Sequence, residues 1–285
     1  MVSIATVIAV CVTLFISLIL PIVVLIVYAI KNKGKGIWTA WLLGAAGFFV
    51  MQIIIRLPIL SILSTNAGFT FFATNHFVLY SFILAFTAGL SEVIGRYVVA
   101  KILSKNLTFE RGIAAGLVHG GIEAMLVIGM TYVNNIIYIL MINLKQFDAI
   151  IDQTAALGVD TSGLVMIKEQ LINANSSIFY LAGYERILTM IAHVALSLLV
   201  CYFVMKKKDI LGIGICVVLH CCMDFVAPLV NGMSTEYLGN IISTTTAYII
   251  VYVFLTLVAV LAVILIKHIY KNWKKAVTLS ETIVA

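Results

Sequence analysis

Seven long apolar segments follow one another along this chain of 285 residues. Because a helix needs about 20 apolar residues to cross a bilayer, each segment predicts one crossing. The composition agrees, since 63% of the residues are hydrophobic and 11% are charged, which excludes a soluble globule. We predict an all-α fold, a polytopic membrane bundle of about seven transmembrane helices in a single domain over residues 1–285. The predicted spans are 4–30, 37–57, 77–100, 112–140, 179–205, 210–230 and 244–267.

The basic residues predict the orientation of the bundle. Thirteen of the 18 lysines and arginines lie in alternate loops, near residues 31–35, 101–111, 206–208 and 267–275. Short cytoplasmic loops carry such an excess, so we expect the N-terminus outside and the C-terminus in the cytoplasm. This placement at span ends explains the net charge of +6 without a nucleic-acid partner. The one long loop, 143–178, is then extracytoplasmic and is predicted to form an amphipathic cap.

Several ionisable side chains lie inside the apolar segments, where each charge costs about 2.5–3.5 kcal/mol on insertion scales. Such residues normally face a bundle interior or a water-filled cavity, so we read them as candidate functional residues. They are Glu92, Arg96, His119, Glu123, Glu185, Arg186, His193, His220 and Asp224.

Three of these spans carry polar pairs four residues apart, which places each pair on one helix face. The pairs are Glu92 with Arg96, His119 with Glu123, and His220 with Asp224. On the fifth span, Arg186, His193 and Ser197 share a face, and Glu185 points about a quarter turn away. Small residues, Ala85 and Gly89 on the third span and Gly112, Gly116 and Gly120 on the fourth, accompany the polar faces and predict closely packed neighbours. We expect the polar faces to converge within the core helices, residues 77–230.

A carboxylate and an imidazole around one water form a hydrolytic site, and a second imidazole can stabilise an oxyanion. The chain has no serine-protease elbow, H-E-x-x-H, P-loop or dinucleotide-binding motif. Peptide hydrolysis inside the bilayer is the activity that this set of residues favours.

Four segments, SEVIGRYVV, RGIAAGLVHGGIEA, YERILTMIAHVALS and LHCCMDF, resemble the motifs of the YhfC-type intramembrane peptidases. More distantly, they are similar to the superfamily of CAAX proteases and bacteriocin-processing enzymes, which are glutamic intramembrane proteases. That superfamily has E-E-x-x-x-R, F-x-x-x-H and H-x-x-x-N/D on three helices. The resemblance covers about residues 85–230 and implies a bacterial plasma-membrane protease that acts on peptides or membrane proteins.

The resemblance implies a role for each matching residue. Glu92 and Arg96 take the second acid and the arginine of the first motif, and Ser91 stands where the leading glutamate would be. His119 matches the second motif, with Ala115 in place of its phenylalanine. His220 and Asp224 match the last motif, which implies that they stabilise an oxyanion.

Because the leading acid is absent, either Glu92 or Glu123 is left to activate water with His119. We favour Glu123, which shares a helix face with His119, and expect Arg96 to orient Glu92. This glutamic mechanism needs no cofactor. His193, Arg186 and Glu185 have supporting positions.

Two alternatives remain open. The first is a zinc metallopeptidase, because imidazole nitrogens and carboxylate oxygens are zinc ligands. Its ligands would come from His119, Glu123, His193 and His220, with Asp224 as a further donor. The second is a proton-coupled transporter or a membrane protein without enzymatic activity, since intramembrane acids and histidines also relay protons.

Overall fold

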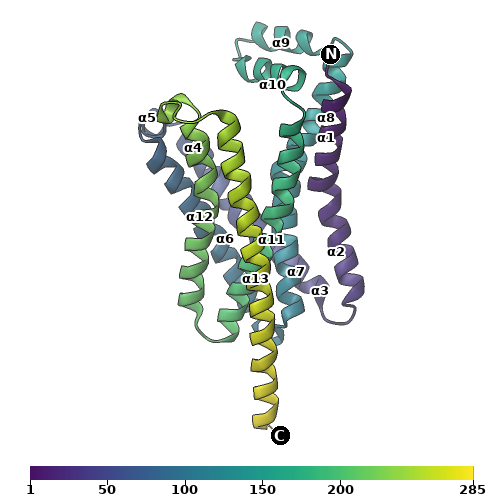
Figure 1. Cartoon of the computed structure of the whole chain (residues 1–285), viewed down its shortest axis with the longest axis vertical. Coiled ribbons are helices and arrows are strands. Elements are labelled where there is room, and N and C mark those ends of the chain that lie inside the picture. The colour runs from purple at the N-terminus through teal and green to yellow at the C-terminus, as the bar shows by residue number, and fades with distance from the viewer. Residues whose placement is uncertain (285) are drawn as a thin grey trace. The chain divides into compact units, whose positions relative to one another are not determined.

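The structure is a computed structural model that describes residues 1–284 and side chains as far as Lys275. Within this part of the chain the fold is all helical and has no strand, which confirms the predicted class (Figure 1). The described residues contain seven helical stretches long and apolar enough to cross a membrane. These are Ile4–Lys31, Ile37–Ser64, Phe77–Asn106, Phe109–Asn143, Ser177–Met205, Asp209–Met233 and Thr244–Lys275.

The second stretch is longer than the predicted span 37–57, because its helix does not stop at Pro58. A π-helical segment, Phe49–Arg56, precedes α4 (Leu57–Ser64), and Pro58 lies in the first turn of α4. The first turn of a helix tolerates a residue without an N–H, so the helix continues. Pro21 occupies the same position in α2 (Leu20–Lys31), after another π-helical segment.

The chain divides into two compact units, and the first contains residues 1–24 and 123–187. Its core includes Tyr132, Phe147, Leu171 and Phe179. The N-terminal end is fixed by a hydrogen bond from the Val2 N–H to Asn143 Oδ1, at 2.8 Å. The unit contains α1 (Ile4–Leu14), α8 (Met130–Asn143), α9 (Phe147–Ala156), α10 (Ser162–Asn173) and the start of α11 (Ser177–Met205).

The long loop 143–178 is thus largely helical and two-sided. Phe147 of α9 and Leu171 of α10 are buried in the core of the first unit, whereas Leu157 and Met166 are exposed. This pattern agrees with the predicted amphipathic segment.

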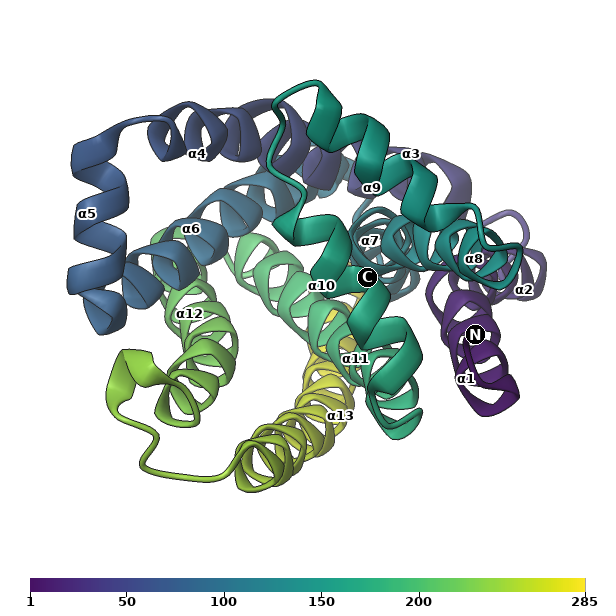
Figure 2. The ribbon, with the colours of Figure 1, turned by 90° about the horizontal axis from the view of Figure 1, so that it is seen from above.

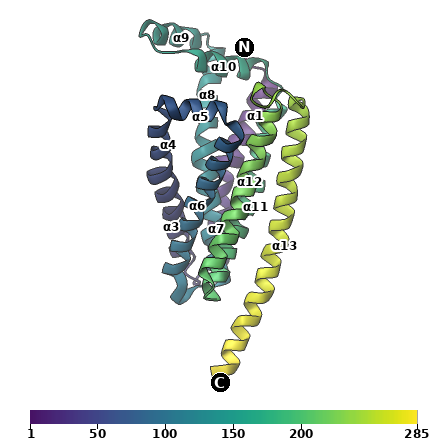
Figure 3. The same ribbon diagram turned by 90° about the vertical axis from the view of Figure 1, so that its left-hand side faces the viewer.

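The second unit contains residues 25–122 and the chain from residue 188 onward. In it α6 packs against α3 on one side and α12 on another, and α12 also packs against α13 (Figure 2). The α12 and α13 helices lie side by side, and α13 extends beyond the end of α12 (Figure 3). The unit includes α3 (Ile37–Phe48), α4, α5 (Ala67–Asn75), α6 (Phe77–Leu103), most of α7 (Phe109–Glu123), the rest of α11, α12 (Asp209–Met233) and α13 (Thr244–Val284).

Small residues bring the helices of the second unit into close contact, as the sequence predicts. A Cβ atom on Gly116 of α7 would lie 2.8 Å from the Cα of Val194 on α11. A Cβ atom on Gly89 of α6 would lie 3.2 Å from the backbone nitrogen of Cys221 on α12. These approaches bring α7 to α11 and α6 to α12, so the polar side chains near each glycine meet across the helix pair.

We therefore expect Gly116→Ala to destabilise the protein by about 1–3 kcal/mol, because the added methyl group meets the α11 backbone and not a flexible side chain. The measurement is thermal unfolding in detergent. Gly214→Ala is the matched control, since a Cβ atom at this α12 glycine meets nothing within 4 Å. An unchanged melting temperature for Gly116→Ala would contradict the close contact.

Candidate active site

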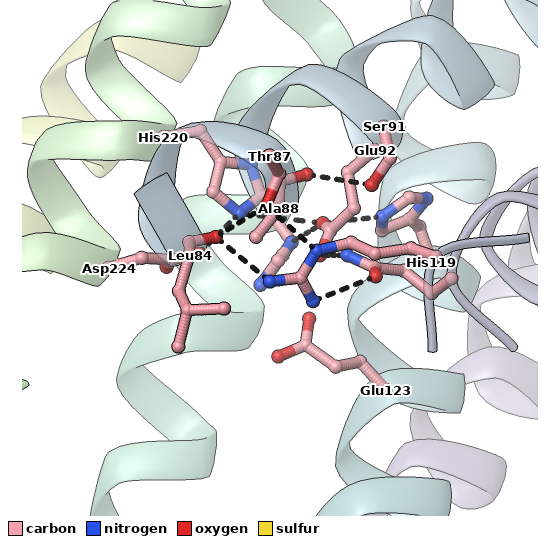
Figure 4. Close-up of polar contacts among 12 residues, drawn as sticks. Leu84, Thr87, Ala88, Ser91, Glu92, His119, Glu123, His220 and Asp224 are labelled. Atoms are coloured by element: carbon pink, nitrogen blue, oxygen red, sulfur yellow. Dashed lines mark hydrogen bonds and ion pairs between the residues drawn. The ribbon is translucent and has the colours of Figure 1, made fainter. Parts of the chain in front are cut away.

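The carboxylate of Glu92 lies at the centre of a buried polar cluster in the second unit (Figure 4). Its Oε2 atom is 3.0 Å from His119 Nε2 and 3.0 Å from the guanidinium of Arg96. His220 Nε2 and His193 Nδ1 are 3.5 and 3.7 Å from the same oxygen. Four helices, α6, α7, α11 and α12, thus contribute side chains to one carboxylate. The predicted convergence of Glu92, Arg96 and the three histidines is present.

Arg96 connects the histidines of the cluster to its acid. Besides Glu92, its guanidinium contacts Nδ1 of His193 at 2.5 Å and Nδ1 of His220 at 3.2 Å, and donates to Ser197 Oγ at 3.2 Å. An arginine can only donate hydrogen bonds, so both Nδ1 atoms act as acceptors. This hydrogen-bond pattern assigns the ring proton of His193 and of His220 to Nε2.

His220 and Asp224 form the outer part of the cluster. His220 Nε2 lies 3.3 Å from Asp224 Oδ2, one helical turn along α12. The imidazole is 1% exposed, whereas the Asp224 side chain is 31% exposed. Asp224 therefore orients a buried imidazole and is itself open to the surroundings.

Three buried residues offer donor atoms that fit a metal ion. Glu92, His119 and His193 each present one ligand atom, and these atoms lie within 4.8 Å of one another. Two imidazoles and one carboxylate form the donor set of many catalytic zinc sites. Arg96 shares the carboxylate and the Nδ1 atom of His193, so it competes with a metal for these donors. The chemistry and spacing of the donors nevertheless fit zinc, with His220 beside them.

Glu123, the acid favoured by the sequence, belongs to the first unit and forms an ion pair there. Its Oε1 atom is 3.3 Å from the guanidinium of Arg186, which also pairs with Glu185. The acid hydrogen-bonded to His119 is Glu92. Within the second unit, the carboxylate in contact with the histidines is Glu92. Glu123, Arg186 and Glu185 thus form a connected group of ion pairs within the first unit.

Two polar residues of the second span were not predicted to be part of the site. Gln52, on the π-helical segment before α4, donates from Nε2 to Glu92 Oε1 at 2.6 Å. Arg56 donates to Gln52 Oε1 at 3.3 Å. Gln52 and Arg56 are four residues apart, like the members of the three predicted pairs. The same spacing could therefore have identified them from the sequence.

We expect Arg96→Met to cost about 3–5 kcal/mol, because it leaves the buried Glu92 charge without its cation. The double variant Arg96→Met/Glu92→Gln should recover part of this loss. Thermal unfolding of detergent-purified protein measures both effects. Lys101→Met is the control, because it removes an exposed ion pair with Asp209 and should change little. Equal losses of stability in Arg96→Met and Lys101→Met would contradict the importance of burial.

Comparison with known proteins identifies the family of the chain. Residues 16–243 match the family described as YhfC intramembrane metalloprotease. The chain is also similar to a Bacillus subtilis (strain 168) protein named "Uncharacterized membrane protein YhfC", with 30% identity over 197 residues, 68% of this chain and 74% of that protein. No solved structure matches the chain. Because the match covers most of its length, the chain belongs to the YhfC intramembrane metalloprotease family.

Proposed function

We propose that this protein is a zinc-dependent intramembrane peptidase in which Glu92, His119 and His193 hold the metal. The observation that carries the proposal is the buried set of two imidazoles and one carboxylate, with donor atoms within 4.8 Å of one another. The metalloprotease description of the family supports it. All three residues lie within membrane-spanning stretches, so the peptide bond would be cut inside the bilayer.

The proposal replaces the cofactor-free glutamic mechanism that the sequence favoured. The family description gives no support to that mechanism and agrees with the zinc alternative. The proposed ligand set also differs from the one expected, because it combines Glu92 with His119 and His193, whereas the sequence offered His119, Glu123, His193 and His220. His220 remains close to Glu92 but serves another role.

Each residue of the cluster has a distinct task in this reaction. Zinc, when bound, supplies Lewis-acid polarisation of a carbonyl and activates water near neutral pH. Arg96 orients Glu92 and keeps the Nδ1 atom of His220 as an acceptor. His220 carries its ring proton on Nε2 beside Asp224, and this N–H would donate to the oxyanion of the substrate in place of its contact with Asp224. Asp224, the more open carboxylate, receives a proton from the attacking water.

The metal requirement is tested with purified protein and a panel of fluorogenic peptides. We expect a chelator to abolish cleavage and added zinc to restore it. His119→Ala and His193→Ala should each lower kcat/KM at least about 100-fold, because loss of a ligand exceeds the usual cost of losing a residue that orients one. Zinc content per chain, measured by mass spectrometry, should fall in both variants.

His268→Ala is the matched control, since this histidine is exposed on α13 and contacts Asn272. It should keep both zinc and cleavage. Cleavage that is insensitive to chelator and lost only in Glu92→Gln or Glu123→Gln would contradict the zinc proposal and restore the glutamic mechanism.

The orientation of the chain is part of the same proposal, with the N-terminus outside and the C-terminus in the cytoplasm. In the first unit the hydrogen bond between Val2 and Asn143 holds the N-terminus at the C-terminal end of α8, where the chain continues into α9 and α10. Loop 143–178 and the N-terminus are therefore expected on one side, opposite the basic loops.

We expect a membrane-impermeant maleimide to label Leu157→Cys in intact cells and to label Lys33→Cys only after the membrane is opened. Both positions are exposed. A protein without its five native cysteines is the background and the control. Labelling of Lys33→Cys in intact cells, with Leu157→Cys protected, would reverse the orientation.

A further inference from the structure

Both oxygens of the Glu92 carboxylate are occupied, and they face different partners. Oε2 faces Arg96 and the histidines, whereas Oε1 accepts a hydrogen bond of 2.6 Å from Gln52 Nε2. Gln52 is 5% exposed and lies at the interface of the π-helical segment Phe49–Arg56 with α6. The hydrogen bond from Gln52 therefore keeps one carboxylate oxygen turned away from the histidines.

The orientation of the Gln52 amide is itself set by a charge. Arg56 donates to Gln52 Oε1 at 3.3 Å, and since a guanidinium only donates, the amide must present its NH₂ group to Glu92. Arg56 is held in turn by the carbonyl of Leu84 at 2.8 Å and the hydroxyl of Thr87 at 3.4 Å. Leu84 and Thr87 lie beside Glu92 in the same cluster of polar contacts (Figure 4). A connected path of donors thus runs from Arg56 through Gln52 to Glu92.

The local backbone makes this path possible. Gln52 and Arg56 both lie on the π-helical segment, a conformation that is frequent at functional sites and places residues differently from an α-helix. The α3 and α6 helices approach closely nearby, because a Cβ atom on Gly95 would lie 2.7 Å from the Gly47 carbonyl. This approach brings Gln52 within reach of α6.

We propose that Gln52, oriented by Arg56, is a positioning residue that directs one oxygen of Glu92 toward His119 and His193. The proposal rests on the zinc-peptidase function, because that function gives Glu92 its role as a ligand. Partners that orient a ligand typically change metal affinity or activity by 10–100-fold when they are removed. Gln52 acts through Glu92 and does not itself touch the substrate.

The test measures zinc affinity by competition with a chelating dye, together with kcat/KM for a cleaved peptide. Gln52→Met should raise the zinc dissociation constant about 10–100-fold. Arg56→Met should weaken zinc binding in the wild-type background and have no further effect in Gln52→Met. Gln52→Asn, which keeps the amide and shortens its reach, gives a second variant if Gln52→Met does not fold. Gln153→Met, an exposed glutamine of α9, is the control.

A thermal-unfolding cycle on the chelated protein provides a readout that needs neither metal nor activity. Gln52→Met should lower the melting temperature in the wild type and much less in the Glu92→Gln background, because the shared hydrogen bond is already altered. Zinc affinity within twofold of wild type in both Gln52 variants, or additive melting shifts, overturns the positioning role. If the wild type binds no zinc, the zinc-peptidase function fails, and the unfolding cycle alone decides whether Gln52 positions Glu92.

Discussion

A carboxylate buried among membrane-spanning helices is the interaction on which the second unit depends. Glu92 is almost fully buried, and a charge in such a place is tolerated only with a nearby cation and with hydrogen bonds to both oxygens. Arg96 supplies the cation, His119 contacts one oxygen, and Gln52 donates to the other. Because His119 lies on α7 and Gln52 on the π-helical segment Phe49–Arg56, satisfying the Glu92 charge also determines how these two segments pack against α6.

The helices can meet at this carboxylate because small residues lie where they contact one another. Gly89 lets α12 approach α6, and Gly116 lets α11 approach α7, each within a turn of a polar residue of the cluster. The membrane gives little hydrophobic drive for helix association, so close van der Waals packing and interhelical hydrogen bonds must hold the bundle. The same contacts that stabilise the unit therefore assemble the site.

Much of this arrangement was predictable from the sequence. The seven spans follow from hydropathy, and spacing of four residues identified Glu92, His119 and His220 with their neighbours on each helix. The hydrogen bond between Glu92 and His119 was not predictable, because a shared helix face does not say which neighbouring helix supplies the partner. Glu123 has Arg186 as its partner, from a segment 63 residues away.

Gln52 and Arg56 were missed for two different physical reasons. A neutral amide has a much smaller insertion cost than a charge, so Gln52 does not stand out in a search for charged residues within spans. Arg56 lay at the predicted end of a span, where a basic residue is ordinary, but the helix continues to Ser64 and leaves the guanidinium half-buried on the α6 backbone. A positive charge there, connected through an amide to a candidate metal ligand, extends the site from the histidines to the second span. The chemistry of the site thus depends on a residue that carries no charge and whose effect comes from how its neighbours orient it.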